Sequence, residues 1–262
     1  MRKAILVACY AVAVLVLGSS GVQSAEKIPS YISAAVADAG RPAEDKQRDE
    51  GRKPAETLLF AGIKPGDKVL ELIPGRGYFT RLLSKAVGPK GHVYALSPPR
   101  RPDAKPDSPD PVAATQAIAA DPAYANVTAS VIEHPEGAER KIAAPEPVDV
   151  VFTAQNYHDL HNAPDLDISH FNKAVFDALK PGGVFVVVDH TAAAGSGTRD
   201  TSTLHRIDPE TVKSEVLAAG FVFAGESKVL ANPEDTHTLK VFDPSIRGKT
   251  DQFILKFRKP KK

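Results

Sequence analysis

Cysteine, methionine and tryptophan are nearly missing from this chain of 262 residues, which has one Cys, one Met and no Trp. Cys9 and Met1 both lie near the N-terminus, so the rest of the chain can form neither a disulfide nor a thiolate metal site. An excess of one charge is missing too, because 33 Lys and Arg residues face 32 Asp and Glu residues. We therefore predict neither nucleic acid nor an anionic membrane surface as a partner. The 42% of hydrophobic residues is typical of a globular protein with a buried core and excludes a disordered chain.

A membrane-spanning run is also missing. The apolar run from Ala4 to Leu17 is 14 residues long, short of the roughly 20 that cross a bilayer, and no later segment supplies a span. Arg2 and Lys3 precede it and small residues follow it up to Ala25, which is the order of a secretory signal peptide. We predict that residues 1–24 are removed on export and that the mature protein is periplasmic or secreted. The mature chain then has no sulfur atom to oxidise.

Residues 25–61 are interpreted as an N-terminal extension. The stretch from Ala25 to Gln47 is polar and rich in alanine. We expect Arg48 to Phe60 to be helical, with Pro54 where a new first turn can start. We interpret this helix as a lid or docking helix on the domain that follows, residues 62–262.

Strand and helix patterns alternate from residue 62 onward, which predicts a parallel sheet. The expected strands are Lys68–Leu72, His92–Leu96, Val127–Ile132, Val148–Thr153, Gly183–Val188, Phe221–Leu230 and Gln252–Phe257. The expected helices are Thr80–Val87, Val112–Ala120, Ile168–Leu179 and Pro209–Ala219, the last capped by Asp208. No helix separates the last two strands, so we expect them to pair as an antiparallel hairpin around the Arg247–Asp251 turn. The predicted fold is α/β, doubly wound, with a mostly parallel seven-stranded sheet.

A glycine turn follows the first expected strand. Its sequence is Glu71-Leu72-Ile73-Pro74-Gly75-Arg76-Gly77-Tyr78-Phe79-Thr80. Glycines in such a turn let the backbone approach a nucleotide, and the following helix N-terminus faces the crevice where open α/β sheets bind ligands. Turn geometry alone also needs glycine, so the place of this turn after the first of seven strands is what indicates a site.

With these features the chain resembles the class I S-adenosylmethionine-dependent methyltransferases, and more narrowly the exported methyltransferase-like proteins of bacteria. The resemblance covers Arg48 to Pro260 and includes the glycine turn and Asn156-Tyr157-His158-Asp159-Leu160-His161 after the fourth strand. It continues through residues 62–67, 179–183, 189–190, 204–208 and 243–251. It implies S-adenosylmethionine as cofactor, with Asn156 beside the methyl group. The implied cofactor-binding residues are Glu71, Pro74, Gly75, Gly77, Tyr78, Ser97 and Asn156.

Two positions depart from that family pattern and keep other functions open. Ile73 stands where the family has its first glycine, and Ser97 stands where an acid takes the ribose hydroxyls. Both departures favour the alternative of a non-catalytic binding module on a methyltransferase scaffold. Ser97 with Arg100 and Arg101 also suits the 2′-phosphate of NADP. However, Thr80 stands where the NADP-binding motif has its third glycine, so we rank an NADP-binding protein below the methyltransferase.

Five of the eight histidines follow the fourth and fifth strands, at the edge where ligands bind. We predict His158, held by Asp159, as general base and His190 as the second choice, with His205 nearby. We expect His161 and His170 to have structural roles. An alternative is a metal site formed by Asp159, Asp189 and these imidazoles. No His-x-x-x-His or Cys-x-x-Cys spacing supports it, so we predict no metal site.

The acceptor of the methyl group is predicted to be a small molecule or a component of the cell envelope. We expect the lid helix and the loop Ser97–Pro111, with six prolines and six charges, to recognise it at the surface. The sequence carries no signal for an oligomeric state.

Overall fold

One sheet of seven strands organises the described part of the chain. The computed structural model describes residues 27–100, 104–105, 107, 110–133 and 140–261; the predicted signal peptide, Arg101 and part of the Pro-rich loop lie outside them. The strands are β1 (Lys68–Leu72), β2 (His92–Ser97), β3 (Val127–Val131), β4 (Val148–Ala154), β5 (Leu179–His190), β6 (Val222–Ser227) and β7 (Gln252–Arg258). Their order is β3-β2-β1-β4-β5-β7-β6, parallel from β3 to β5, with β7 antiparallel to both of its neighbours. The predicted doubly wound α/β fold with an antiparallel C-terminal hairpin is confirmed.

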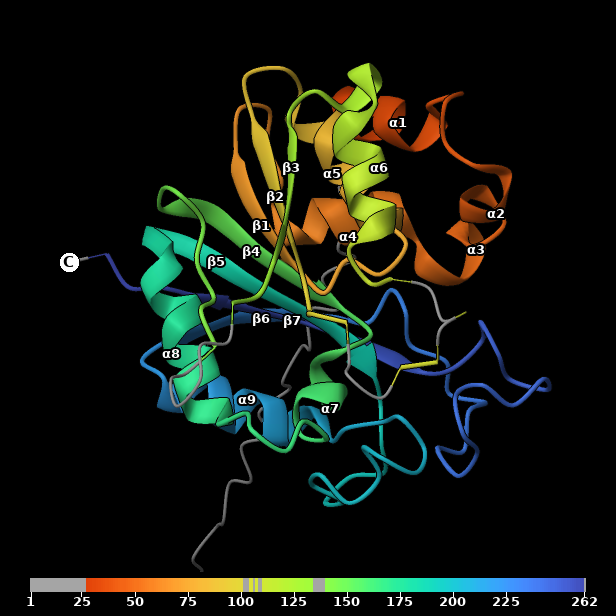
Figure 1. The fold of residues 1–262 in the computed structure, drawn as a ribbon. Helices are drawn as coiled ribbons and strands as arrows, with labels where there is room; N and C mark the ends of the chain where they lie inside the picture. The colour runs from red at the N-terminus through yellow and green to blue at the C-terminus, as the bar shows by residue number, and fades with distance from the viewer. Residues whose placement is uncertain (1–26, 101–103, 106, 108–109, 134–139, 262) are drawn as a thin grey trace, which may run out of the picture.

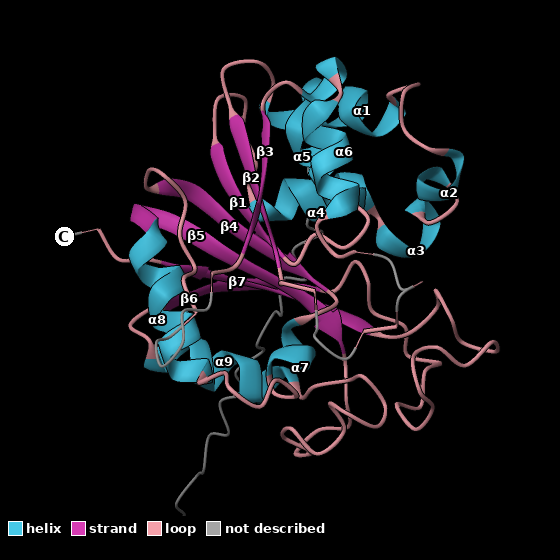
Figure 2. Cartoon of the chain, viewed as in Figure 1, coloured by secondary structure: helices cyan, strands magenta, loops and turns pink. Residues whose placement is uncertain are grey.

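Helices cover both faces of this sheet (Figures 1 and 2). One face carries α1 (Ser30–Ala37), α4 (Pro54–Ala61), α5 (Tyr78–Val87) and α6 (Ala113–Ala120), and the other carries α7 (Tyr157–Leu160), α8 (Ile168–Ala178) and α9 (Pro209–Ala218). Alternate residues of each central strand enter two separate cores: Val150 and Phe152 of β4 pack on the first face and Val151 on the second. Burial on both faces explains the apolar stretches at residues 150–152 of β4 and 184–188 of β5.

The start of α9 follows the predicted capping chemistry. Asp208 caps α9 by accepting a hydrogen bond from the backbone N–H of Glu210, and Pro209 takes the first helical position. Asp167 caps α8 in the same way. Boundaries differ from expectation at β5, which begins at Leu179 rather than Gly183, and at β6, which is shorter than Phe221–Leu230. Terminal residues are the least determined part of any pattern.

The helical segment predicted over Arg48–Phe60 is divided into two helices, and the second starts at Pro54, as expected. The segment forms α3 (Asp49–Arg52) and α4, separated by Lys53 with a left-handed φ of 41°. The ring of Pro54 disfavours helical backbone at the residue before it, so the chain breaks there and restarts. The polar stretch before it also forms α1 and α2 (Ala43–Lys46), and Ile32 of α1 is fully buried in the first core.

A polar connection, residues 228–251, joins β6 to β7 and is anchored by a buried ion pair. Arg206 is fully buried and lies 2.9 Å from a carboxylate oxygen of Asp235. The same guanidinium donates to the backbone oxygens of Leu239 and Thr191 at 3.0 Å each. This links the connection to the carboxyl end of β5. None of the helices in the described residues has the length and apolar character to cross a bilayer.

Candidate active site

The glycine turn leaves β1 in a left-handed conformation at three residues. φ is 53° at Ile73, 58° at Gly75 and 78° at Gly77, which is the N-cap of α5. A β-branched residue rarely adopts this conformation, whereas glycine does so freely. Ile73 therefore differs from the family's glycine in its side chain, but its backbone has the left-handed conformation that a glycine would adopt.

A cleft of about 280 Å³ opens above this turn, between the carboxyl ends of β1 and β4. Its walls are Arg48, Arg52, Glu71, Leu72, Ile73, Pro74, Gly75, Arg76, Tyr78, Phe79, Ala154, Gln155, Asn156 and Asp159. Five of the seven predicted cofactor-binding residues are among them, and Gly77 and Ser97 are not. The parallel order of the strands brings these residues to one edge of the sheet.

Gly77 and Ser97 instead pack against α6. A Cβ on Gly77 would lie 2.1 Å from Cδ1 of Ile118, whereas a Cβ on Gly75 would meet nothing within 4 Å. The buried Ser97 hydroxyl lies 3.3 Å from the Thr115 hydroxyl. Gly75 is thus the glycine that leaves the turn open toward the cleft.

Glu71 is the acid at the floor of the cleft. It is buried, and this burial raises its carboxyl pKa to about 7, despite a 2.6 Å hydrogen bond from the Thr80 hydroxyl and the nearby positive charges of Arg52 and Arg81. Near neutral pH the carboxyl is therefore divided between its charged and neutral forms. A cation bound beside it would favour the charged form.

Two arginines of the N-terminal segment form a wall of the cleft that the sequence analysis missed. The guanidiniums of Arg48 and Arg52 lie 4.9 and 4.6 Å from the centre of the Tyr78 ring, and Arg52 also donates to the Gln155 side chain. Burial and the charge of Arg48 lower the pKa of Arg52 to about 10, so it stays positive at neutral pH. The i, i+4 spacing of Arg48 and Arg52 was the signal in the sequence that could have indicated two side chains on one side of the segment.

This segment is fixed in place through Tyr78 and Asp49. The Tyr78 hydroxyl donates to Asp49 at 2.6 Å, and Asp49 also receives two hydrogen bonds from the buried guanidinium of Arg41. Asp45 pairs with both Arg48 and Arg81. The predicted lid is therefore tied to the glycine turn by charged hydrogen bonds, which are stronger than neutral ones.

Asn156 joins the ends of β1 and β4. Its amide nitrogen donates to the backbone oxygens of Ile73 and Ala154 at 3.1 and 3.0 Å, and its carbonyl accepts from the Thr153 hydroxyl. The residue is buried. Its side chain both lines the cleft and holds the glycine turn against β4.

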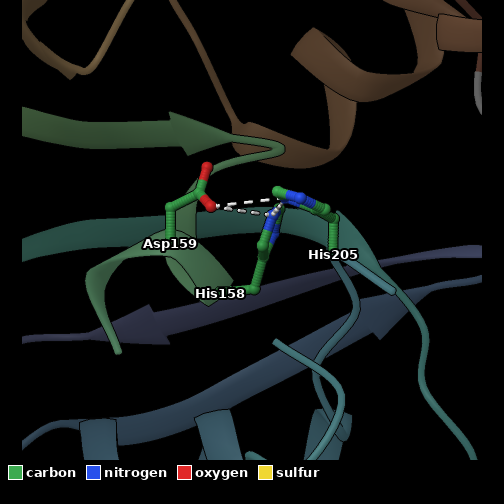
Figure 3. Close-up of side chains that lie close together, drawn as sticks. All are labelled: His158, Asp159 and His205. Atoms are coloured by element: carbon green, nitrogen blue, oxygen red, sulfur yellow. Dashed lines mark hydrogen bonds and ion pairs between the residues drawn. The ribbon is translucent and has the colours of Figure 1, made fainter. Parts of the chain in front are cut away.

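A group of histidines and carboxylates adjoins the cleft through Asp159, the member of the group that lines it, and we name His158, Asp159, Asp189, His190 and His205 the histidine rim. His158 Nδ1 lies 2.8 Å from Asp189, and His158 Nε2 lies 3.3 Å from both Asp159 and His205 Nδ1 (Figure 3). The His190 ring centre is 6.3 Å from that of His158. Asp159 contacts the His158 ring as expected, at Nε2. Asp189 makes the shorter contact, at Nδ1, because β5 runs beside β4 and Asp189 lies opposite the start of α7.

Asp189 gives the rim a fixed negative charge. It is fully buried and accepts hydrogen bonds from the His158 ring and from the backbone N–H groups of His158 and His190, each at 2.8 Å. Burial opposes ionisation, but the neighbouring His158 outweighs it and keeps the Asp189 pKa below its ordinary value. Burial likewise opposes charge on His158, and Asp189 and Asp159 together raise its pKa.

The other histidines differ in their surroundings. Burial lowers the pKa of His190 to about 4, so its ring is neutral at pH 7 and bonds the Thr250 hydroxyl at 2.8 Å. Burial also lowers the pKa of His205. His161 lies 3.3 Å from Glu215, and His170 is exposed beside Asp167, both outside the rim.

The site is thus a cleft lined by an acid, a glycine turn and two arginines, and the histidine rim adjoins this cleft at Asp159. Solved structures of similar architecture include an S-adenosylmethionine-dependent methyltransferase from Aquifex aeolicus, with TM-score 0.56, 20% identity and coverage of 84% of this chain and 98% of that chain. The chain has the fold of S-adenosylmethionine-dependent methyltransferases. A methyltransferase of this kind from Mesorhizobium loti has TM-score 0.54, 14% identity and coverage of 80% and 99%.

The same fold also includes a protein with another named reaction. The [4+2]-cyclase SpnF has TM-score 0.52, 18% identity and coverage of 86% of each chain. No protein-family model matches the chain, and no curated protein sequence matches it either. At these identities the similarity establishes the fold, and the reaction has to be argued from the residues of the site.

Proposed function

We propose that this protein is an S-adenosylmethionine-dependent methyltransferase that binds its cofactor in the cleft above the glycine turn. The observation that carries the proposal is the open space over Gly75, next to the buried Glu71 and the half-buried Arg52. A methyl donor of this type has a cationic sulfonium and an amino acid end with both charges. Glu71 suits the cationic part, and Arg52 suits the carboxylate.

The residues present fit the amino acid end of this cofactor better than its ribose. Gly75, Pro74, Tyr78 and Asn156 line the cleft around that end, while Ser97 offers no acid and its hydroxyl faces Thr115. When bound, the cofactor supplies an activated methyl group. The task of the chain is then to align the acceptor with it and to exclude water.

The histidine rim is proposed to bind the acceptor and to take up its proton. In the absence of a metal ion, His158 is the general base, because Asp189 holds Nδ1–H and leaves Nε2 directed toward Asp159, which lines the cleft. His190 is the second choice, and its lowered pKa makes it the weaker base. A small phenol, thiol or amine, free or in the envelope, is the class of acceptor proposed.

Calorimetric titration with S-adenosylmethionine, S-adenosylhomocysteine and NADP tests the proposal. We expect the first two to bind and NADP not to bind. Gly75→Asn should weaken binding by at least about tenfold, because a side chain there enters the cleft. Gly66→Asn is the matched control, since Gly66 also has a positive φ and free space but precedes β1. Equal affinities in the two variants would place the ligand elsewhere.

A non-catalytic binding module is the second candidate function. Ile73 and Ser97, which depart from the family pattern, favour it. Release of S-adenosylhomocysteine in a screen of phenols, thiols and amines separates the two functions. If the cofactor binds and no acceptor releases product, the binding module is favoured.

We also propose that the mature protein is periplasmic or secreted, as the first 24 residues predict. Mass spectrometry of the exported protein should give an N-terminus near Ala25. A cytosolic protein that retains Met1 would contradict export.

A further inference from the structure

Three ligand atoms of the histidine rim form a nearly equilateral triangle. They are His158 Nε2, His205 Nδ1 and Asp159 Oδ1, and the three separations are 3.3, 3.3 and 3.5 Å (Figure 3). The side chains come from α7 and from the loop after β5, so the folded chain alone brings them together. All other groups of the rim lie outside this triangle.

The size of the triangle fits a tetrahedral metal ion. A metal–ligand distance of about 2.0–2.1 Å at a tetrahedral site requires ligand atoms about 3.3–3.4 Å apart. An octahedral ion at the same distance requires neighbouring ligands only about 2.9–3.0 Å apart. The measured separations therefore favour a tetrahedral ion, for which two imidazoles and one carboxylate are ordinary ligands.

His158 is oriented as a metal ligand by the buried carboxylate of Asp189. Asp189 lies 2.8 Å from Nδ1, which places the ring proton on Nδ1 and the lone pair of Nε2 toward Asp159 and His205. A carboxylate that holds the far nitrogen of a ligating histidine is a recurring feature of metal sites. Asp189 is itself fixed by two backbone N–H groups, so the ring has little freedom to turn.

Electrostatics favours a positive charge inside the triangle. The lone pair of a neutral His158 Nε2 would otherwise face a carboxylate oxygen at 3.3 Å with no hydrogen between them. A proton on Nε2 or a metal ion can supply the charge, and the two exclude each other. A proton on Nε2 can form a hydrogen bond to one neighbouring atom at a time, whereas a metal ion can bind all three ligand atoms at once.

We propose that His158, Asp159 and His205 bind one divalent transition-metal ion, with zinc the best fit, at the acceptor end of the cleft. Asp159 is half exposed and lines the cleft, so the remaining coordination position opens toward it. An open position is the mark of a catalytic rather than a structural ion. An acceptor oxygen or thiol bound there loses its proton more easily, which replaces His158 as the base. The binding itself does not depend on the proposed methyl transfer.

Zinc titration of the untagged protein, in competition with a chromophoric chelator and without S-adenosylmethionine, tests this inference. We expect one ion per chain. Asp159→Asn and His205→Asn should each weaken binding by more than about 100-fold, since loss of an outer partner alone costs about 10- to 100-fold. Asparagine keeps the size of Asp159 and tolerates the left-handed backbone of His205, whose φ is 56°. Both variants should therefore fold.

His170→Ala is the matched control, because it removes an exposed imidazole that lies beside a carboxylate but belongs to no group of three possible metal ligands within the described residues. It should bind zinc as the wild type does, and cobalt in the wild type should give the intense visible absorption of a tetrahedral ion. No zinc in the wild type, or equal zinc in Asp159→Asn, His205→Asn and His170→Ala, would overturn the inference. Zinc binding without cofactor binding would leave it standing and refute the proposed function alone, and cofactor binding without zinc would do the reverse.

Discussion

Replacement of Glu71 by glutamine should change how stability depends on pH. Burial raises the carboxyl pKa from its ordinary 4.5 to about 7 in the folded chain. At about 1.4 kcal/mol for each tenfold change in proton affinity, the ionised form costs the fold about 3 kcal/mol. The folded chain keeps this proton between pH 4.5 and 7 after the unfolded chain has lost it. Stability from this group is therefore complete below pH 4.5, falls as pH rises toward 7 and is constant above that.

Urea unfolding of wild type and Glu71→Gln at pH 4.5 and pH 8 measures this effect. Other groups titrate in both proteins and cancel in the difference. We expect Glu71→Gln to gain about 3 kcal/mol relative to wild type between the two pH values. Glu56→Gln removes an exposed carboxylate from α4 and should show no comparable gain. A difference that is constant with pH, or that favours wild type at pH 8, would refute the reasoning.

The same carboxyl links pH to cofactor binding. A cation beside Glu71 favours the ionised form, so wild-type affinity for S-adenosylmethionine should rise as pH increases through about 7. Glu71→Gln should lack this rise. Titrations at pH 6 and pH 8 measure it, and an equal rise in both proteins would place the cation away from Glu71.

Two further predictions concern stability. Gly77→Ala should cost about 2–5 kcal/mol, because a left-handed backbone adds about 1–2 kcal/mol and Ile118 must move aside at about 1–3 kcal/mol, whereas Gly75→Ala should cost only the backbone part. Urea unfolding compares the two, and equal losses would contradict the packing argument. Arg206→Met should cost about 3–5 kcal/mol, since it leaves the buried carboxylate of Asp235 without its partner. A loss below about 1 kcal/mol in thermal unfolding would contradict this.

The sheet could be predicted because its signals are local and repeated. Each strand is an apolar run followed by a turn and a helix, and parallel pairing follows from that alternation. The N-terminal helices could not be predicted from the sequence, because α1 buries little more than Ile32 and Ala35 and shows no long periodic pattern. Their positions depend on packing against α5 and α4, which the sequence of the segment does not encode by itself.

The candidate site likewise has parts that could be predicted from the sequence and parts that could not. The parallel order placed His158 and His190 on one edge, and the structure brings them together. Adjacency in sequence suggested Asp159 as the partner of the His158 ring, and Asp159 does contact this ring, at Nε2. Asp189 reaches the ring from the neighbouring strand. The arginines of the cleft wall were missed because the break at Lys53 determines where they point.

Asp159 decides whether the two ends of the cleft act as one site or two. Its carboxylate lines the cleft and also belongs to the proposed metal triangle, whereas Glu71 and Gly75 belong only to the cofactor end. Asp159→Asn removes one negative charge at the acceptor end and keeps the shape of the side chain. If the ends are independent, zinc affinity falls by more than about 100-fold while S-adenosylmethionine affinity changes by less than about threefold. A loss of cofactor affinity as large as that of Gly75→Asn would mean that the carboxylate contacts the cofactor itself, and the acceptor would then have to bind nearer to His190.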